Sequence, residues 1–286
     1  MDPSAIAANV SSIFSLPDVV FRVTDLINSG KVTNTQLEQT ILNDPALTAR
    51  ILKFANCAYF GFSGKIETVS HAIFLIGHKE LRTLVIATSV TSTFKGISSD
   101  LVDMDKFWYH SVTCGVVARL LAVNADSRER FFIAGLLHGV GNLILFSQYP
   151  EESEKILSVM DKGEDAVADA ERNLFGFTHA ELGAELLKQW QLPLSIWKLV
   201  EFQIDPLREE AFKDDACILC AAVNIANYIQ PCTNQRVSFE EVKPTYELET
   251  WNHLDLSSEA IESIITIAKL QVIEVLNAIR PETTQS

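Results

Sequence analysis

The chain has 286 residues, of which 48% are hydrophobic, and a net charge of −14 from 37 acidic and 23 basic residues. This length and apolar content support one large core or two smaller ones and exclude extensive disorder. An acidic surface repels nucleic-acid phosphates and anionic lipids, so we expect neither a nucleic-acid partner nor a membrane partner. The first residues do not resemble a secretory signal, and no uninterrupted apolar run reaches bilayer length. We therefore expect a cytoplasmic protein.

The five cysteines are consistent with that compartment. Their odd number, without a secretory signal, predicts reduced thiols. Cys217 and Cys220 form a CxxC pattern inside an apolar helical run, and no second pair of ligands accompanies them. We interpret them as buried, inert thiols rather than as a redox or zinc motif.

Helical periodicity dominates the chain. Apolar residues recur at spacings of three and four, and no convincing alternation with period two is found. Asp44 followed by Pro45 predicts a helix start, and Gly77 predicts a helix end. The sequence predicts an all-α protein with three parts: residues 1–98, an N-terminal helical part; residues 99–230, a helical core; and residues 231–286, an irregular segment followed by a C-terminal helix.

Two surface features allow two interpretations each. Tyr59, Phe60 and Phe62 lie in a glycine-rich break at residues 56–65, where they could cover a core edge or contact a partner, and covering the core is the simpler reading. The amphipathic C-terminal helix is likewise expected to pack on the rest of the chain rather than to dimerise.

Residues 131–146, FFIAGLLHGVGNLILF, form the most apolar stretch. We expect a helix buried on every face, because apolar residues occupy all of its sides. His138 is its central polar residue, with Gly135, Gly139 and Gly141 close by. Glycines at such positions indicate that another backbone or a ligand approaches closely.

Three histidines of the predicted core, His110, His138 and His179, could bind a metal ion if the fold brings them together. For each of them alone, a hydrogen-bonded core histidine is the simpler interpretation.

The segment GLLHGVGNLIL resembles the metal-binding motif of HD-domain phosphohydrolases, and the wider pattern resembles the HDOD family (HD-related output domain) over roughly residues 15–229. The matching residues run in order: Leu16-Pro17, Asp44 to Leu47, Leu52 to Phe60, Ala72-Ile73, Leu81-Arg82, His110-Ser111, Gly135 to His138, His179, Gly183, Trp190 and Leu192-Pro193. This resemblance implies an HD-domain-like helical bundle with an N-terminal helical subdomain packed on it. It also implies a role in bacterial signal transduction.

The departures from the HD pattern concern the metal ligands. The resemblance implies that His110 and His138 keep two ligand positions, whereas Gly139 replaces the aspartate of the His-Asp doublet. The late aspartate falls on Asn224 or Asn227. We therefore expect a vestigial pocket without catalytic residues, cofactor or metal, formed by His110, His138, Gly139, His179, Asn224 and Asn227. If a metal is held at all, the expected ligands are His110, His138 and His179.

Two functions follow from these residues. HD hydrolysis uses a metal that lowers the pKa of bound water toward about 7, and a hard divalent ion needs carboxylate ligands. Their loss favours a non-catalytic regulatory module that contacts signalling proteins in trans or senses a small ligand in the pocket. The alternative is a metal-dependent phosphohydrolase acting on nucleotides or cyclic dinucleotides, completed by a carboxylate from Asp103, Asp105 or Glu181.

A nucleic-acid reading of the segment LIGHKELRTL is disfavoured, because His78, Lys79 and Arg82 are too few charges for a phosphate track.

Overall fold

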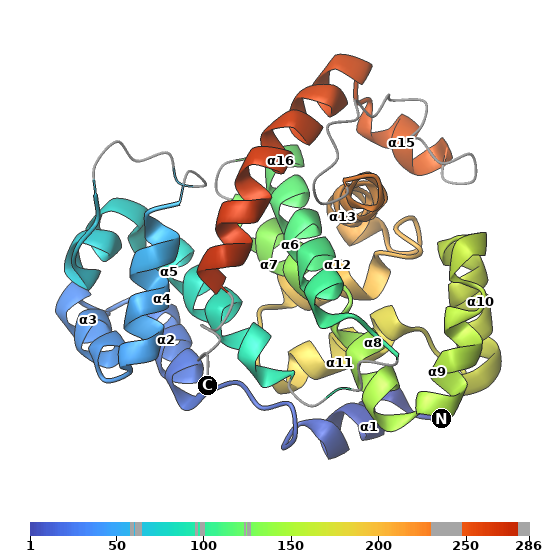
Figure 1. Cartoon of the computed structure of the whole chain (residues 1–286), viewed down its shortest axis with the longest axis horizontal. Coiled ribbons are helices and arrows are strands. Elements are labelled where there is room, and N and C mark those ends of the chain that lie inside the picture. The colour runs from blue at the N-terminus through green and yellow to red at the C-terminus, as the bar shows by residue number, and fades with distance from the viewer. Residues whose placement is uncertain are drawn as a thin grey trace. The chain divides into compact units, whose positions relative to one another are not determined.

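The computed structural model describes residues 1–57, 60, 65–94, 97, 101–122, 124, 127–229 and 248–279. Within these ranges the regular elements are helices and no strand occurs, which confirms the predicted all-α class (Figure 1). Most of the predicted aromatic break, with Tyr59 and Phe62, lies outside the described residues, as do Cys232 and the larger part of the irregular segment.

The chain divides into two compact units: Met1–Phe14 with Gly96–Ala268, and Ser15–Lys95 with Lys269–Ser286.

The smaller unit is built around its longest helix. This helix, α5, packs against three shorter ones. Asp44 caps α4 by accepting a hydrogen bond from the Leu47 N–H at 2.9 Å, with Pro45 in the first helical position, as predicted. Gly77 interrupts α5 with a φ of +78°, which suits glycine and confirms the predicted break. The helices are α2 (Asp18–Asn28), α3 (Asn34–Leu42), α4 (Pro45–Ala55) and α5 (Val69–Thr93).

The C-terminal helix α16 (Ser258–Ile279) is shared by the two units, which divide it after Ala268. In the smaller unit, the Thr91 hydroxyl of α5 donates to the Ile279 carbonyl at 3.0 Å. This end of the helix packs on its own chain, as expected.

The larger unit contains the predicted core. Its longest helix, α6, packs along α7 and α13, while α11 contacts α1, α8 and α12. Its α-helices, besides the first half of α16, are α1 (Pro3–Val10), α6 (Met104–Leu121), α7 (Arg128–Leu137), α8 (Val140–Gln148), α9 (Pro150–Leu157), α10 (Glu164–Phe175), α11 (His179–Gln189), α12 (Leu194–Phe202), α13 (Lys213–Asn227) and α15 (Leu248–Leu254).

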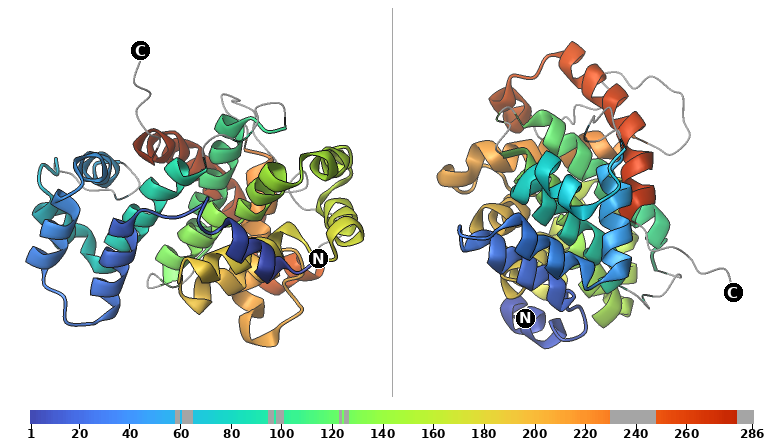
Figure 2. Two further views of the ribbon diagram at one scale, coloured as in Figure 1. Left: turned by 90° about the horizontal axis from the view of Figure 1, so that it is seen from below. Right: turned by 90° about the vertical axis from the view of Figure 1, so that its left-hand side faces the viewer.

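The first helix belongs to this larger unit, although residues 1–98 were expected to form one N-terminal part. Figure 2 shows α1, in dark blue, beside the yellow α11. The amino group of Met1 donates to the Phe175 carbonyl at 2.8 Å, and the Trp190 indole N–H donates to the Phe14 carbonyl at 2.8 Å. These contacts join segments more than 170 residues apart, which local sequence patterns do not reveal.

The apolar stretch at residues 131–146 is two helices rather than the single helix expected. α7 ends at Leu137, α8 begins at Val140, and His138 with Gly139 forms the junction. Gly139 has φ −97° and ψ 7°, outside the helical region. Arg128–Gln148 is also the one described segment long and apolar enough to cross a bilayer, but 83% of its most apolar window is buried inside the protein. Its apolarity therefore serves the core.

Glycines allow the helices around this junction to touch backbone to backbone. A Cβ atom on Gly135 of α7 would lie 2.7 Å from the Cys114 carbonyl of α6, and one on Gly115 would lie 2.8 Å from the Phe132 carbonyl. On the other side, a Cβ on Gly141 of α8 would overlap the His179 carbonyl of α11. The glycines thus meet neighbouring helices. The sequence led us to expect that either another backbone or a ligand approaches them closely, and the structure shows the backbone.

We predict that Gly141→Ala destabilises the protein by about 1–3 kcal/mol, because the added methyl group meets backbone that cannot move aside cheaply. Urea unfolding at neutral pH measures this. Gly139→Ala is the matched control, since its Cβ would meet only the Phe107 ring, at 3.2 Å. A Gly141→Ala variant no less stable than Gly139→Ala would contradict the proposed packing role.

Candidate functional site

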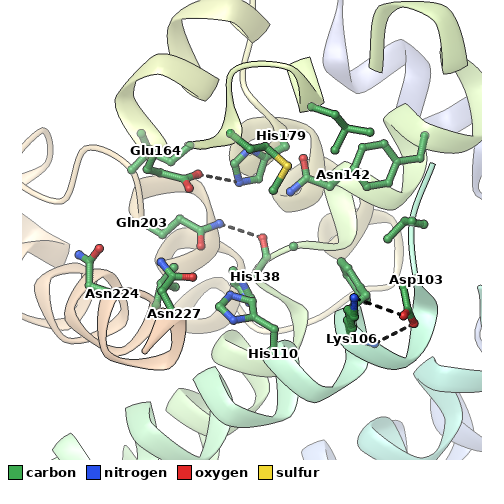
Figure 3. A pocket seen from close by; sticks show the side chains of 18 of the residues that line it. Asp103, Lys106, His110, His138, Asn142, Glu164, His179, Gln203, Asn224 and Asn227 are labelled. Atoms are coloured by element: carbon green, nitrogen blue, oxygen red, sulfur yellow. Dashed lines mark hydrogen bonds and ion pairs between the residues drawn. The ribbon is translucent and has the colours of Figure 1, made fainter. Parts of the chain in front are cut away.

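The junction between α7 and α8 opens onto a cavity of about 520 Å³ within the larger unit. All six residues of the predicted pocket line it. So do five polar or thiol side chains that were not expected there, namely Lys106, Asn142, Glu164, Gln203 and Cys220. Figure 3 shows His110 and His138 together on one wall and His179 beside Glu164 on another. The predicted residues are His110, His138, Gly139, His179, Asn224 and Asn227.

His138 is held in a defined orientation. Its Nδ1–H donates to the Gly135 carbonyl at 2.7 Å, which leaves Nε2 as the nitrogen with a free lone pair. The Gln203 amide donates to the His138 carbonyl at 2.8 Å and so holds the junction from the other side. The sequence alone gave no indication of Gln203, because it comes from the end of α12.

His110 and His138 form a neutral pair. Their rings lie edge to face with centroids 5.2 Å apart. Burial lowers the pKa of His110 from its ordinary value of 6.5 to about 4. Burial, together with the neighbouring His110, lowers the pKa of His138 to about 3. At neutral pH both imidazoles are therefore uncharged and able to donate a lone pair.

Cys114 joins this pair. It lies one helical turn after His110 on the same face of α6, and its Sγ is 3.4 Å from His110 Nε2 and 3.9 Å from His138 Nε2. The thiol is fully buried, and burial raises its pKa well above the ordinary value. The i, i+4 spacing from His110 is the sequence signal that could have distinguished Cys114 from the other thiols.

His179 stands apart from the other two histidines. Its Nδ1 contacts both carboxylate oxygens of Glu171 at 2.9 Å, and its Nε2 lies 3.5 Å from Glu164. Burial by itself would lower the pKa of His179, but the two carboxylates outweigh burial and raise it to about 9. His179 is therefore a cation in a buried ion pair, and it is not among the side chains whose donor atoms gather around His138. The expected three-histidine set is not assembled.

The Phe107 ring lies next to the position of the missing aspartate. A Cβ on Gly139 would lie 3.2 Å from the Phe107 ring, so the ring occupies space beside the backbone there. The CxxC thiols agree with the sequence interpretation in their burial, since Cys217 and Cys220 are both buried. The Asn224 amide donates to the Cys220 sulfur at 3.7 Å.

Carboxylates at the cavity already have partners. Among the described lining residues only Asp103 and Glu164 carry one. Asp103 caps α6 by accepting from two backbone N–H groups, at 2.9 and 3.1 Å, and Glu164 faces His179. Glu181 forms a capping box with Thr178 and contacts Arg208 at 3.4 Å, while Asp105 does not line the cavity.

This helical fold, with two imidazoles meeting at a helix junction, defines an HD-domain-like protein. Residues 13–206 match the HDOD domain model, and the chain belongs to the HDOD family.

Solved structures show the same fold. A Shewanella amazonensis SB2B protein named as a candidate phosphohydrolase is 23% identical, with a TM-score of 0.77 over 96% of this chain and 98% of that one. An HDOD protein of unknown function from Geobacter sulfurreducens is 25% identical, with a TM-score of 0.66 and 96% of both chains covered. A candidate signal transduction protein from Marinobacter aquaeolei VT8 is 17% identical, with a TM-score of 0.70 over 94% of this chain and 61% of that one.

Among curated proteins, an uncharacterized protein of Treponema pallidum (strain Nichols) is 22% identical over 268 residues. The match covers 91% of this chain and 51% of that protein, so the chain spans about half the length of this relative.

We predict that stability falls as the pH drops below 6.5 toward 4. In that range the unfolded histidines take up protons that folded His110 and His138 refuse, so the unfolded state binds more protons. Each group contributes a slope of up to about 1.4 kcal/mol per pH unit. Urea unfolding between pH 4 and 7 measures the slope, and His110→Gln should flatten it. An equal slope in both proteins would contradict the lowered pKa.

The opposite trend is predicted for His179. Its folded pKa is raised, so its contribution to stability is complete below pH 6.5 and is lost as the pH rises through about 9. Glu171→Gln should weaken this dependence and cost about 3–5 kcal/mol at pH 6.5, because it removes the closer of the two carboxylates that pair with the buried imidazolium. Asp169→Asn is the control, since Asp169 lies exposed on the same helix and pairs with Arg172 only at 3.9 Å. Equal losses in the two variants would contradict the ion-pair role.

Proposed function

We propose that this chain is a non-catalytic regulatory module in signal transduction, whose cavity binds a ligand without hydrolysing it. The observation that carries the proposal is the glycine at position 139, directly after the buried His138. Output would pass to signalling proteins in trans, in the cytoplasm. Membership of the HDOD family and the likeness to a protein named for signal transduction support this role.

The cavity does not fit the divalent ion that HD-type hydrolysis requires. A hard dication such as Mg²⁺ takes oxygen ligands, mostly carboxylates. Gly139 has no side chain, and the amides of Asn224 and Asn227 carry no charge. Asp103 and Glu164 are held by α6 and by His179.

A ligand-binding role agrees with the composition of the walls. The described lining combines four side-chain amides with two neutral imidazoles and with apolar groups such as Phe107 and Phe146. A cavity of about 520 Å³ lies within the ordinary size range of small-molecule sites, and a few polar groups in an apolar wall are typical of them. The amides are Asn142, Gln203, Asn224 and Asn227.

We predict no hydrolysis of nucleotides or cyclic dinucleotides with Mg²⁺ or Mn²⁺ above the rate of a His110→Ala variant. Product release followed by chromatography measures this. Turnover by the wild-type protein that disappears in His110→Ala would overturn the proposal and favour the phosphohydrolase alternative.

A pair of variants at position 139 controls this experiment. Gly139→Asp restores the carboxylate, and Gly139→Asn adds a side chain of the same shape without the charge. Both require the Phe107 ring to shift. Mn²⁺ affinity, followed by electron paramagnetic resonance, should rise by about tenfold or more in Gly139→Asp alone, a gain of about 1.4 kcal/mol. If the wild-type protein bound Mn²⁺ as tightly as Gly139→Asp does, the lost carboxylate would not be the reason why the cavity does not fit a hard dication.

A further inference from the structure

Three donor atoms of soft or borderline character meet at the α6–α7 contact. His110 and Cys114 lie one turn apart on α6, and His138 ends α7. All three ligand atoms lie within 4.8 Å of one another. From this cluster we propose that His110, Cys114 and His138 bind one transition-metal ion of the Zn²⁺ class.

The spacing is that of a preformed site. In a tetrahedral zinc centre, bonds of about 2.3 Å to sulfur and about 2.0–2.1 Å to nitrogen place the sulfur and nitrogen atoms about 3.6 Å apart. Here Sγ of Cys114 lies 3.4 Å from His110 Nε2 and 3.9 Å from His138 Nε2. The ion therefore requires only small side-chain movements.

The orientation of His138 supports the same conclusion. A histidine that ligates a metal commonly donates its other ring N–H to a carbonyl or carboxylate, which fixes the ring and its tautomer. His138 Nδ1–H makes this bond to the Gly135 carbonyl, so Nε2 faces Cys114 as a lone-pair donor. The close α6–α7 contact at Gly135 and Gly115 brings the two helices into that register.

The donor chemistry selects the ion. Thiolate and imidazole favour Zn²⁺ and other late transition metals, whereas Mg²⁺, Ca²⁺ and Mn²⁺ prefer oxygen. Binding breaks the S–H bond of Cys114, forms a metal–sulfur bond, and releases the proton to solvent. His110 and His138 line the cavity, so the ion can enter from there and its fourth position faces it.

The geometry alone supports the metal site. The further idea that the bound ion is the ligand sensed by the cavity rests on the proposed function. The simpler alternative is a hydrogen-bonded cluster, in which the Cys114 thiol donates to His110 Nε2. That arrangement explains the short sulfur–nitrogen distance without a metal. Titration with Co²⁺ distinguishes the metal site from the hydrogen-bonded cluster.

Titration of the chelator-treated protein with Co²⁺ tests the site. We expect one equivalent to bind, with a thiolate-to-cobalt charge-transfer band in the near ultraviolet and the strong visible bands of tetrahedral cobalt. Zn²⁺ should displace it. Cys114→Ser should lose the charge-transfer band, and the affinity should fall by at least the roughly 10–100-fold that removal of an outer partner causes.

Cys220→Ser is the matched control, because Cys220 is another buried thiol of the same cavity and should keep the band. Circular dichroism verifies the folding of each variant, and His138→Gln provides a second loss-of-ligand variant. Absence of Co²⁺ and Zn²⁺ binding, or a charge-transfer band that survives in Cys114→Ser, would overturn the site. Neither result affects the hydrolysis experiment, so failure of the metal site and failure of the non-catalytic proposal are distinguishable.

Discussion

The close contact of α6 with α7 is the constraint on which the site depends. Gly115 and Gly135 remove the side chains that would keep the two backbones apart. Because the helices touch there, the turn of α6 that carries His110 and Cys114 faces the end of α7, where His138 lies. Gly141 lets α8 approach α11 equally closely on the other side of the junction. Glycine, which weakens an isolated helix, here sets the distances between the helices.

One cavity holds histidines in two opposite states, and the difference comes from their neighbours. His110 and His138 face each other and a thiol, so burial keeps both neutral. His179, which is buried as deeply, faces two carboxylates and keeps its proton. A charged ligand group would therefore meet neutral nitrogen donors on one wall and an already neutralised ion pair on another. Lys106, which also lines the cavity, lies 3.9 Å from the Asp103 carboxylate, so the described lining has little unpaired positive charge to offer a phosphate.

Helix content and several helix ends could be predicted from the sequence, because caps and breaks are local. Asp44, Thr178 and Gly77 act through residues three or four positions away, or through their own φ angle. The six residues of the predicted pocket line one cavity. Which of these residues pair with one another could not be predicted from the sequence, because the pairing depends on which helices touch. Cys114 had no distinguishing pattern apart from its spacing to His110, and Glu171 looked like one of many surface acids.

The break at His138–Gly139 shows the same limit. Its flanking sequence has helical periodicity throughout, and glycine within such a pattern does not by itself end a helix. The Gln203 amide, which donates to the His138 carbonyl, satisfies a backbone group that the break leaves without a helical partner. That partner lies 65 residues further along the chain. A break supported from so far away cannot be recognised locally.

The absence of a carboxylate at position 139 and the presence of Cys114 belong together chemically. A dication held by aspartates and histidines keeps enough positive charge to activate water, because its oxygen ligands are hard and leave open positions. A thiolate is a softer donor than a carboxylate and favours Zn²⁺ and other late transition metals. With glycine at position 139 and a thiol one turn from His110, the proposed site favours a borderline or soft ion over the hard dication of HD-type hydrolysis.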